Sequence, residues 1–408
     1  MSVKKATINS LPTKKLLLAG AGHAHIGLLR RLITERPAHL DITLITEEPQ
    51  TIYSGMLPGW MAGHYHLDEI SIDIVSLCVQ AGVRLIQRPI IKVDATSRIV
   101  TATDNETVDY DVLSLNTGAD TDIRWLGKDK DTAITTTNTT EPSKFDGEPH
   151  SKPHSDSNSD TVIAIRPLSI FIQQWQQILL NAARSDAYKL VIVGAGAAAT
   201  ELVMSAQVAL KRINVNHQVC LVCGDELLSG FDQTFRRRVI KQLKRHNIKT
   251  IYARATGYQK GQLRTSQGSL SVDAVIAATG VVGSGWTKET NLEIVGNGFI
   301  AVNATQQSIS HANVFAVGDV ATRVDKEMAH SGVHAVHGGA IEADNILSYL
   351  ADEPMKTYQP RSRTLYLLSC GDKYAIGSWG NHSLQSRWIW YLKRRIDKRF
   401  IKASQLKS

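Results

Sequence analysis

The sequence contains the same local pattern twice: an apolar strand that runs into glycines and then into a helix. The first copy spans 16–22 and the second spans 190–196. Glycines at this place let the backbone approach a pyrophosphate group at the N-terminus of a helix. Two such sites in one chain predict two bound dinucleotides that face each other and exchange electrons. This interpretation makes the chain a flavoprotein.

The two copies also agree at their ends. Each closes with an apolar strand that begins at an Asp and runs into Thr-Gly, at 111–118 in the first copy and at 273–280 in the second. A repeated opening and ending at matched spacing is far more specific than a lone Gly-x-Gly. We therefore predict an α/β fold with two Rossmann-like dinucleotide-binding domains. The predicted cofactor contacts at the two endings are Thr117, Gly118, Thr279 and Gly280.

The first glycine turn departs from the usual fingerprint. Gly20 and Gly22 allow the tight turn and the approach to phosphate, but His25 stands where a third glycine is common. We expect His23 and His25 to be neighbours of the cofactor phosphate, or packing residues. Glu47, just past the next strand, is expected to hold the ribose hydroxyls, with a solvated surface acid as the alternative.

The second glycine turn fits the fingerprint G-x-G-x-x-G/A with Gly194, Gly196 and Ala199. The next strand runs into Asp225, which favours the free 2′-hydroxyl of NADH, and no arginine is adjacent in the sequence. The arginines at 236–238 keep NADPH as an alternative. Glu201, just inside the following helix, is expected to reach the nicotinamide as a catalytic residue, or else to complement the helix dipole.

Asp319 is the residue on which the flavin prediction depends most. An apolar strand at 314–317 ends in Gly318-Asp319, which aims one carboxylate at the hydroxyls of a ribityl chain. Gly332 and Val333 are expected to begin a helix beneath the flavin pyrimidine ring, where the positive helix end favours the anionic reduced flavin. The apolar, glycine-rich segment 53–63 is expected to lie along the flavin or to form a passage for an apolar acceptor.

Several segments together resemble a known family: 20–25, 53–59, Arg166-Pro167, Gly318-Asp319 with Gly332-Val333, 375–380 and 387–397. They resemble the flavoproteins with two dinucleotide-binding domains, which include type II NADH dehydrogenases and sulfide:quinone oxidoreductases. The resemblance is greatest to the NADH-dehydrogenase-like flavoprotein domain found fused to selenide, water dikinase. It implies FAD in the first site, NADH in the second, and a further electron acceptor. The cofactor contacts that it adds are Gly55, Met56, Leu57, Pro58 and Arg166.

The motif order implies an interrupted first domain, because Gly318-Asp319 should serve the first nucleotide. Residues 127–160 are rich in Ser, Thr, Asp, Lys and Pro with almost no apolar residues, which is typical of a flexible insert. The predicted divisions are 1–126 (FAD-binding domain, first part), 127–160 (insert), 161–294 (NAD(P)H-binding domain), 295–362 (FAD-binding domain, second part) and 363–408 (C-terminal region with strands and an amphipathic helix).

The C-terminal segment 387–408 carries almost all of the formal net charge of +8. A basic tail on a neutral body argues against nucleic acid as a partner. Trp388, Leu392, Ile396 and Phe400 recur every four residues, which suits a helix on an anionic membrane surface, with packing on the flavin domain as the alternative. No apolar run approaches the ~20 residues of a membrane span. We expect a cytoplasmic protein, or one peripheral on the cytoplasmic face of a membrane.

The sequence thus predicts an FAD-dependent oxidoreductase that takes hydride from NADH and passes electrons to a second acceptor, with a membrane quinone favoured. Sulfide:quinone oxidoreduction is an alternative that requires cysteine near the flavin, where only Cys370 is a candidate. A selenium- or sulfur-related reductase and a low-turnover flavin redox sensor are further alternatives. No metal site is expected, since Cys220 and Cys223 lie in a strand-like run and point to opposite faces.

Overall fold

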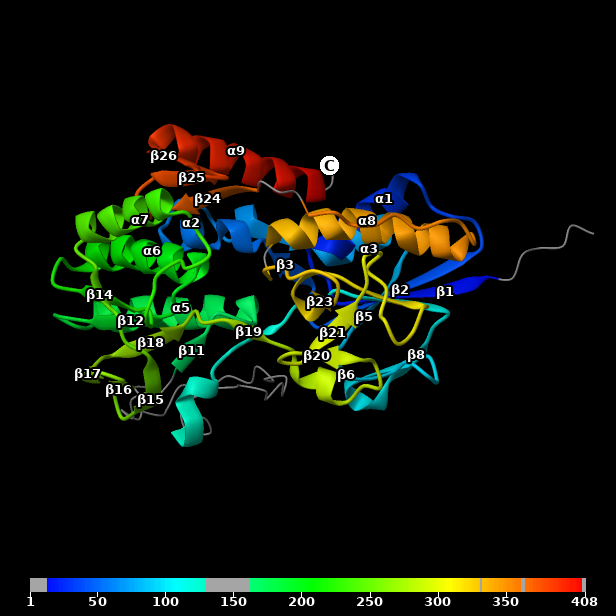
Figure 1. Ribbon diagram of the computed structural model, residues 1–408, viewed down its shortest axis with the longest axis horizontal. Coiled ribbons are helices and arrows are strands. Elements are labelled where there is room, and N and C mark those ends of the chain that lie inside the picture. The colour runs from blue at the N-terminus through cyan, green and yellow to red at the C-terminus, as the bar shows by residue number, and fades with distance from the viewer. Residues whose placement is uncertain (1–12, 130–161, 331, 361–363, 406–408) are drawn as a thin grey trace, which may run out of the picture.

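Two five-stranded parallel sheets form the centres of the molecule (Figure 1). The computed structural model describes residues 13–129, 162–330, 332–360 and 364–405, so the predicted insert at 127–160 lies outside the described residues apart from its first positions. The first sheet has the order β22-β9-β1-β2-β5, with β1 (Lys14–Ala19), β2 (Leu40–Thr46), β5 (Arg84–Gln87), β9 (Val112–Leu115) and β22 (Val314–Ala316). The second has the order β11-β18-β12-β13-β14, with β11 (Val162–Ala164), β12 (Lys189–Val193), β13 (Gln218–Val222), β14 (Lys249–Ile251) and β18 (Ala274–Ala277).

The two sheets repeat one topology. The central strands β1 and β12 each lead through glycines into a helix, α1 (His23–Thr34) and α6 (Ala197–Ile213). Each half also carries an antiparallel three-stranded sheet: β6 (Ile90–Asp94), β7 (Ile99–Ala102) and β8 (Thr107–Asp109), then β15 (Ala255–Gln259), β16 (Gln262–Thr265) and β17 (Gly268–Ser271). The predicted α/β class with two Rossmann-like units is confirmed.

The apolar runs of the central strands explain why they lie in the middle of a layered structure. Successive side chains of a strand point to opposite faces. Leu16 and Leu18 pack into the core that includes α1 and α3 (Ile74–Ala81), whereas Leu17 and Ala19 pack into a second core on the other face. A strand that is covered on both faces needs an apolar residue at every position, as parallel sheets usually do.

One edge strand of each sheet, β22 in the first and β11 in the second, shows how the chain connects the two sheets. β22 follows the second sheet in sequence yet completes the first, pairing with β9, whereas β11 precedes the rest of its own sheet. The chain therefore crosses between the two sheets twice. At the crossings β10 (Asp120–Thr121) pairs with β19 (Val281–Val282).

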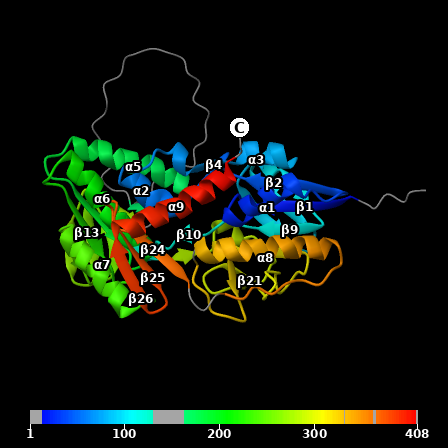
Figure 2. The ribbon, with the colours of Figure 1, turned by 90° about the horizontal axis from the view of Figure 1, so that it is seen from above.

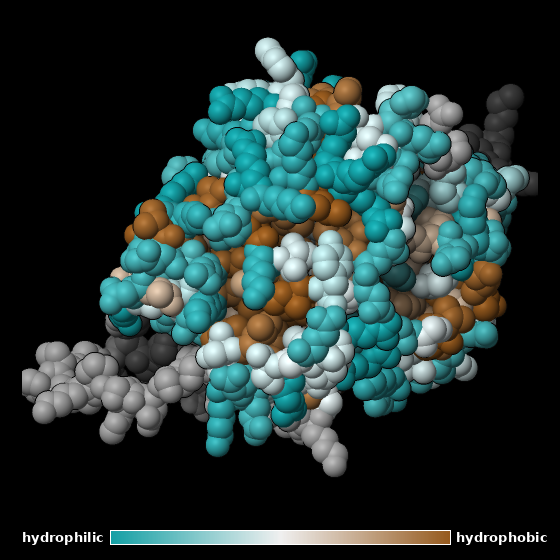
Figure 3. Space-filling view, turned by 60° about the vertical axis from the view of Figure 1, so that its left-hand side comes forward, coloured by the Kyte–Doolittle hydropathy of each residue, from teal (hydrophilic) through white to brown (hydrophobic). Residues whose placement is uncertain are grey.

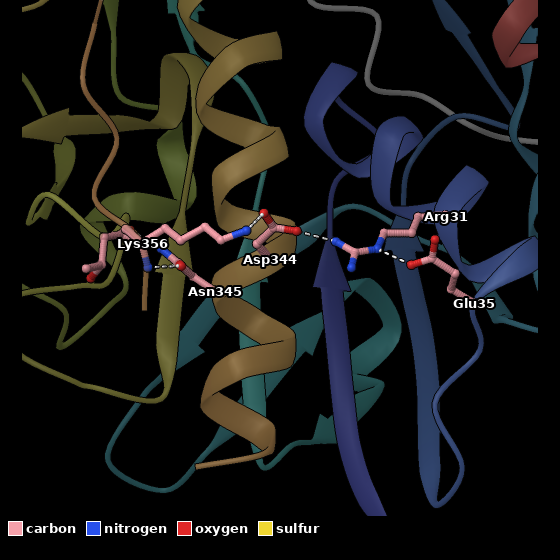
Figure 4. A network of polar contacts seen from close by, with 6 residues as sticks. Arg31, Glu35, Asp344, Asn345 and Lys356 are labelled. Carbon is pink, nitrogen blue, oxygen red and sulfur yellow. Dashed lines mark hydrogen bonds and ion pairs between the residues drawn. The ribbon is translucent and has the colours of Figure 1, made fainter. Parts of the chain in front are cut away.

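Helix α8 (Gly332–Leu350) returns the chain onto the first sheet and packs against α1. The two helices approach closely, since a Cβ on Gly339 would lie 2.4 Å from the Cβ of Ala24. Figure 4 shows the polar contacts at this packing: Arg31 of α1 pairs with Asp344 of α8, which also pairs with Lys356 at 2.7 Å.

The C-terminal region lies over both halves of the molecule (Figure 2). A sheet of β24 (Leu365–Ser369), β25 (Ala375–Trp379) and β26 (His382–Ser386) leads into α9 (Arg387–Ser404). The Ser386 hydroxyl accepts a hydrogen bond from the Ile389 amide and begins this helix as its N-cap. The other helices and strands are β3 (Gln50–Ile52), α2 (Leu57–Met61), β4 (Ser71–Asp73), α5 (Leu168–Ala183), α7 (Gln233–Arg245), β20 (Ile294–Val295), β21 (Phe299–Val302) and β23 (Ala321–Arg323).

Candidate functional site

The first glycine turn lies directly against the end of β9. Gly20 has φ +87°, and a Cβ there would lie 2.6 Å from the backbone oxygen of Asn116. A Cβ on Gly22 would lie 2.2 Å from the side-chain oxygen of the same residue. No larger side chain fits at either position, so the glycines are required by the close approach of two backbones at the start of α1.

Asn116 is a structural residue beside this turn that the sequence analysis missed. Its side chain is buried, its oxygen accepts a hydrogen bond from the Ala24 amide at 3.1 Å, and its nitrogen donates to the carbonyl of Val317 at 2.7 Å. It thereby joins the start of α1 to the end of β22. The only signal was its place before Thr117-Gly118, and an asparagine at a strand end is ordinary turn chemistry.

Asp319 and Arg166 meet across the two halves of the chain. Arg166 Nη1 lies 2.5 Å from Asp319 Oδ2, with the arginine placed between β11 and α5 and the aspartate directly after β22. The other carboxylate oxygen, Oδ1, is buried and has no partner among the described residues. A buried carboxylate oxygen without a donor is unfavourable. The geometry therefore leaves one acceptor for a donor group that is not among the described residues.

His25 is part of an internal network. The ring is fully buried, with Nδ1 at 2.5 Å from the carbonyl of Gly20 and Nε2 at 2.6 Å from the Ser114 hydroxyl, which in turn lies 2.9 Å from Glu342. Burial lowers the pKa of His25 to about 4 and raises that of Glu342 to about 8. At neutral pH the histidine is uncharged and the glutamic acid keeps its proton. These contacts agree with the packing alternative for His25, and its place as a neighbour of the cofactor phosphate stays a prediction.

His23 differs from His25 because one of its ring nitrogens has no hydrogen-bond partner among the described residues. Its ring packs edge-on against Tyr53, with centroids 5.3 Å apart, and Nε2 is buried without a partner among the described residues. Burial lowers the pKa of His23 to about 4, with Asp319 acting against this shift and Arg166 with it. His23 Nε2 and Asp319 Oδ1 are thus two polar atoms beside the first glycine turn that lack a partner among the residues the structure describes.

A buried polar cluster joins the segment after β3 to α9. Lys393 Nζ donates to the carbonyl of Gly55 at 2.6 Å and to Asp397 at 2.8 Å, and the Tyr53 hydroxyl donates to Asp397 at 3.2 Å. The side chains of Lys393 and Asp397 are only 12% and 7% exposed. Such a pair persists only when both charges are hydrogen-bonded, as they are here.

Glu201 joins this cluster from the second half of the chain. It lies on α6, and its carboxylate accepts a hydrogen bond from the Ser369 amide at 2.6 Å. Burial raises the pKa of Glu201 to about 7, with Lys393 and the Ser369 amide acting against the shift and Asp397 adding to it. A carboxyl group with this pKa gains and loses a proton near neutral pH, which is the property that a general acid or base requires.

Cys370 follows Ser369 and is fully buried. Its sulfur lies 4.0 Å from the carbonyl of Leu368, and burial raises the pKa of its thiol far above the usual range. A thiol held in this form is a poor nucleophile, because reactivity belongs to the thiolate. The geometry gives no support to the sulfide alternative, which needs a reactive cysteine.

The second glycine turn repeats the contacts of the first. A Cβ on Gly194, where φ is +154°, would lie 2.2 Å from the carbonyl of Ala278, the residue before Thr279-Gly280, and 2.9 Å from the Cβ of Ala199. A Cβ on Gly196 would meet no atom within 4 Å. One side of the turn therefore packs against the end of β18, whereas the space beside Gly196, at the start of α6, is open.

Asp225 has an arginine neighbour that the sequence analysis did not foresee. Arg254, which follows β14, donates through Nη2 at 2.5 Å and through Nε at 3.2 Å to the Asp225 carboxylate. The arginines at 236–238 do not supply this neighbour: Arg236 binds Glu226, and Arg238 donates to Ser383.

The remaining predicted site residues take varied positions. Glu47 is exposed directly after β2, and partial burial together with Glu48 raises its pKa. Met56 and Leu57 are buried in apolar cores, and the Gly55 carbonyl accepts a hydrogen bond from Lys393. That this segment lies along the flavin, or forms a passage for an apolar acceptor, stays a prediction. The Thr117 hydroxyl is buried and has no partner among the described residues, whereas the Thr279 hydroxyl donates a hydrogen bond to the carbonyl of Asp122. Gly118 and Gly318 have positive φ angles of +78° and +79°, and a Cβ on Gly280 would meet no atom within 4 Å. Pro58 lies in α2, and Gly332 and Val333 lie at the start of α8.

Comparison with known families decides the class of protein. The family described as pyridine nucleotide-disulphide oxidoreductase matches residues 14–339, which is most of the chain. The chain belongs to this family. The predicted membership of a family of pyridine-nucleotide oxidoreductases is thereby confirmed.

Relatives and solved structures agree with this membership. The chain is 28% identical over 218 residues to ferroptosis suppressor protein 1 of Taeniopygia guttata and 25% identical to the Homo sapiens protein, covering 50% of this chain and 57% of each relative. It therefore spans little more than half of the length of these relatives. Two solved structures show the same fold. Sulfide:quinone oxidoreductase of Aquifex aeolicus matches with a TM-score of 0.75 and 16% sequence identity, over 96% of this chain and 91% of that chain. NDH2 of Plasmodium falciparum with NADH matches with a TM-score of 0.71 and 12% sequence identity, over 96% of this chain and 97% of that chain.

Proposed function

We propose that this protein is an FAD-dependent oxidoreductase that takes hydride from NADH or NADPH and delivers electrons to a membrane quinone. The observation that carries the proposal is Asp319 Oδ1, a buried carboxylate oxygen beside the first glycine turn that has no partner in the described part of the chain. A ribityl hydroxyl is a donor of the kind that this oxygen lacks. We assign FAD to the first half, with contacts from Gly20, Gly22, His23, Glu47, Gly55, Thr117, Gly118, Arg166, Gly318, Asp319, Gly332 and Val333. We assign NAD(P)H to the second, with contacts from Gly194, Gly196, Ala199, Thr279 and Gly280.

The chain's own residues have separate tasks in this proposal. The flavin, when bound, supplies the acceptor for hydride and the donor of electrons. Arg166 occupies one oxygen of Asp319 and leaves the other to orient a ligand. The glycine turns bring backbone amides close to the two pyrophosphates.

Glu201 and Lys393 provide the proton chemistry in this proposal. A quinone that receives two electrons must also receive protons, and Glu201 exchanges a proton near pH 7. Lys393, fixed by Gly55 and Asp397, stabilises the carboxylate that remains after proton release. Glu201 lies on α6, two residues after Ala199, which we assign to the NAD(P)H site.

A direct test is NADH oxidation by the purified yellow protein with a panel of acceptors: quinones, sulfur and selenium compounds, dyes and oxygen. We expect quinones to support the fastest turnover, and Cys370→Ser to leave that rate unchanged because the thiol is buried. Faster turnover with a selenium or sulfur compound would favour that alternative instead. Absence of flavin reduction by NADH over minutes would favour the redox sensor.

The pair of Asp225 and Arg254 bears on the choice between NADH and NADPH. An acid at this position binds the 2′-hydroxyl of NADH, whereas an arginine beside it accommodates the 2′-phosphate of NADPH. We propose that both nucleotides are used.

Arg254→Gln is expected to lower kcat/KM for NADPH about 10-fold, since one charge-assisted hydrogen bond is lost, and to change the value for NADH little. Steady-state kinetics with both nucleotides measures this, with Arg264→Gln on β16 as the control. Equal losses for both nucleotides would refute the assignment.

We further propose that α9 docks on an anionic membrane surface. Trp388 is 81% exposed, and Tyr391, Leu392 and Ile396 are exposed with it, next to Arg395, Arg399 and Lys402. The predicted stripe is not continuous: Phe400 is half-buried and stacks on Tyr53, because a step of four residues turns about 40° around a helix. In the described part of the chain, no helix has the length and apolar character of a membrane span.

Exchange of the basic residues tests this docking without disturbing the core, whereas deletion of α9 would remove the buried Trp390, Asp397 and Ile401. In the triple variant Arg395→Gln, Arg399→Gln and Lys402→Gln, we expect binding to anionic vesicles to fall about 100-fold, at roughly 1 kcal/mol per cation. Vesicle sedimentation measures this, and the exposed lysines 260, 288 and 326 changed to Gln form the control. Undiminished binding of the triple variant, or equal binding to neutral vesicles, would contradict the proposal.

A further inference from the structure

Three polar side chains form a buried network behind the first glycine turn: His25 on α1, Ser114 on β9 and Glu342 on α8. Hydrophilic side chains cover much of the face drawn in Figure 3, where water surrounds them. In contrast, His25 and Ser114 are 0% exposed and Glu342 is 2% exposed. Burial of polar groups costs free energy that only their mutual hydrogen bonds offset. Apolar groups of the same shape would serve the core as well.

The hydrogen bonds of this network run in one direction and end on the Gly20 carbonyl. His25 Nδ1 lies 2.5 Å from that carbonyl, which only accepts, so the neutral ring carries its proton on Nδ1. Nε2 is then the acceptor for the Ser114 hydroxyl at 2.6 Å. The Ser114 oxygen in turn accepts the proton of the Glu342 carboxyl, 2.9 Å away. The His25 ring is therefore held from both sides.

The second half of the chain shows that the fold itself does not need this network. The spacing from the two glycines puts Ala199 where the first half has His25. Ser114 is the third residue of β9, and Ile276 is the third residue of β18, which pairs with the second central strand in the same register. The same topology thus forms with an alanine and an isoleucine at these two positions. The network therefore serves something that belongs to the first turn alone.

The Gly20 carbonyl decides which way the next peptide group faces. In a trans peptide the C=O and N–H groups point in opposite directions. Because the carbonyl is held on the side of His25, the Ala21 amide points to the other side. The amide of Gly22 already binds the carbonyl of Asn116, whereas the Ala21 amide has no acceptor among the described residues. It is a donor just before the N-terminus of α1, where backbone amides bind phosphate.

We propose that Glu342, Ser114 and His25 are positioning residues for FAD. Through the His25 ring they hold the Gly20 carbonyl, so that the Ala21 amide faces the cofactor pyrophosphate. This inference rests on the proposed function, which assigns FAD to the first half. In the usual fingerprint a third glycine allows close packing of helix and strand at this place. Here the side chain that replaces it contacts the turn itself, and it acts without touching the cofactor.

A matched pair of variants at His25 tests the proposal by titration of the apoprotein with FAD. In His25→Asn, the side-chain amide nitrogen takes the place of Nδ1 and still donates to the Gly20 carbonyl. In His25→Leu, the side chain is of similar size and has no donor. We expect the Asn variant to bind FAD nearly as tightly as the wild type, and the Leu variant about 10-fold more weakly, the effect of one misplaced hydrogen bond to a charged group. Equal affinities in the two variants would overturn the proposal.

The triple variant His25→Ala, Ser114→Ile and Glu342→Leu removes all three polar side chains together and gives the first half two residues of the second. Because both partners of each side-chain pair become apolar, the apoprotein should keep its thermal unfolding midpoint. Its affinity for FAD should nevertheless fall about 10-fold, as in His25→Leu. Wild-type affinity in the folded triple variant would show that the network only fills the core.

Gln207→Leu is the control for a general loss of stability. Gln207 is 2% exposed on α6 in the second half, where it donates to the His246 carbonyl and accepts from the Val219 amide. This variant should lower the unfolding midpoint and leave the affinity for FAD unchanged. Failure of the wild-type apoprotein to bind FAD would overturn the FAD assignment and this inference together. Binding by the wild type with equal affinity in all variants would overturn this inference alone.

Discussion

Asp319→Ala is expected to yield a colourless protein that has lost the flavin. The Asp319 side chain is only 13% exposed, with one carboxylate oxygen bonded to Arg166 and the other without a partner among the described residues, so its removal deletes the acceptor that we assign to the ribityl hydroxyls. It also leaves Arg166 without its partner. The loss of charge-assisted hydrogen bonds at one residue weakens binding about 10- to 100-fold. Absorbance of the purified protein near the flavin maximum, and titration of the apoprotein with FAD, measure this.

The control for this experiment is Asp41→Ala, which removes an exposed carboxylate from β2 in the same half of the chain. It should bind FAD like the wild type. Circular dichroism separates loss of the cofactor from loss of the fold. If Asp319→Ala retained FAD with undiminished affinity, the assignment of the first site would be wrong, and with it the proposed electron path.

Glu201→Gln is expected to lower turnover with quinone about 100-fold or more, the usual effect of removing a general acid or base. The amide retains an acceptor for the Ser369 amide, so the local fold should persist. Hydride transfer from NADH to the flavin needs no proton from this side chain and should keep its rate. Stopped-flow reduction by NADH and steady-state turnover with quinone separate the two half-reactions.

The pH profile provides a second measure for Glu201. Burial raises the pKa of this carboxyl to about 7, so the proton is present below pH 7 and lost above it. If Glu201 donates a proton to the acceptor, wild-type turnover should fall as the pH rises through 7, and the Gln variant should show a flat profile there. Glu293→Gln, an exposed acid of the second half, is the control. An unchanged pH profile in the Glu201 variant would show that another group supplies the proton.

The glycine turns and Asp319 were predictable because their signals are local. A strand, a glycine turn and a helix follow one another within a few residues, and the backbone geometry there excludes other side chains. Gly20 and Gly194 show this, since each faces a backbone oxygen from the last strand of its own repeat. That the repeat occurs twice made the fold class predictable as well.

The side chains whose surroundings come from distant segments could not be placed from the sequence alone. His25 takes the position of a fingerprint glycine, but Ser114 and Glu342, far away in the chain, form the internal network that its ring joins. Arg254 is well separated from Asp225 in sequence and reaches it only because β13 and β14 are neighbours in the sheet.

By itself the sequence determined the two-fold repeat, the glycines that admit a phosphate, and the acid after β22, because each depends on a few consecutive residues. Only the tertiary structure decided three further features. Arg166 meets Asp319, Glu201 lies close enough to Lys393 and Asp397 of α9 for their charges to shift its pKa, and one face of α9 is buried while the other is exposed. The physical reason is that hydrogen bonding, burial and pKa depend on which segments lie side by side, and packing brings residues together that the chain separates by hundreds of positions.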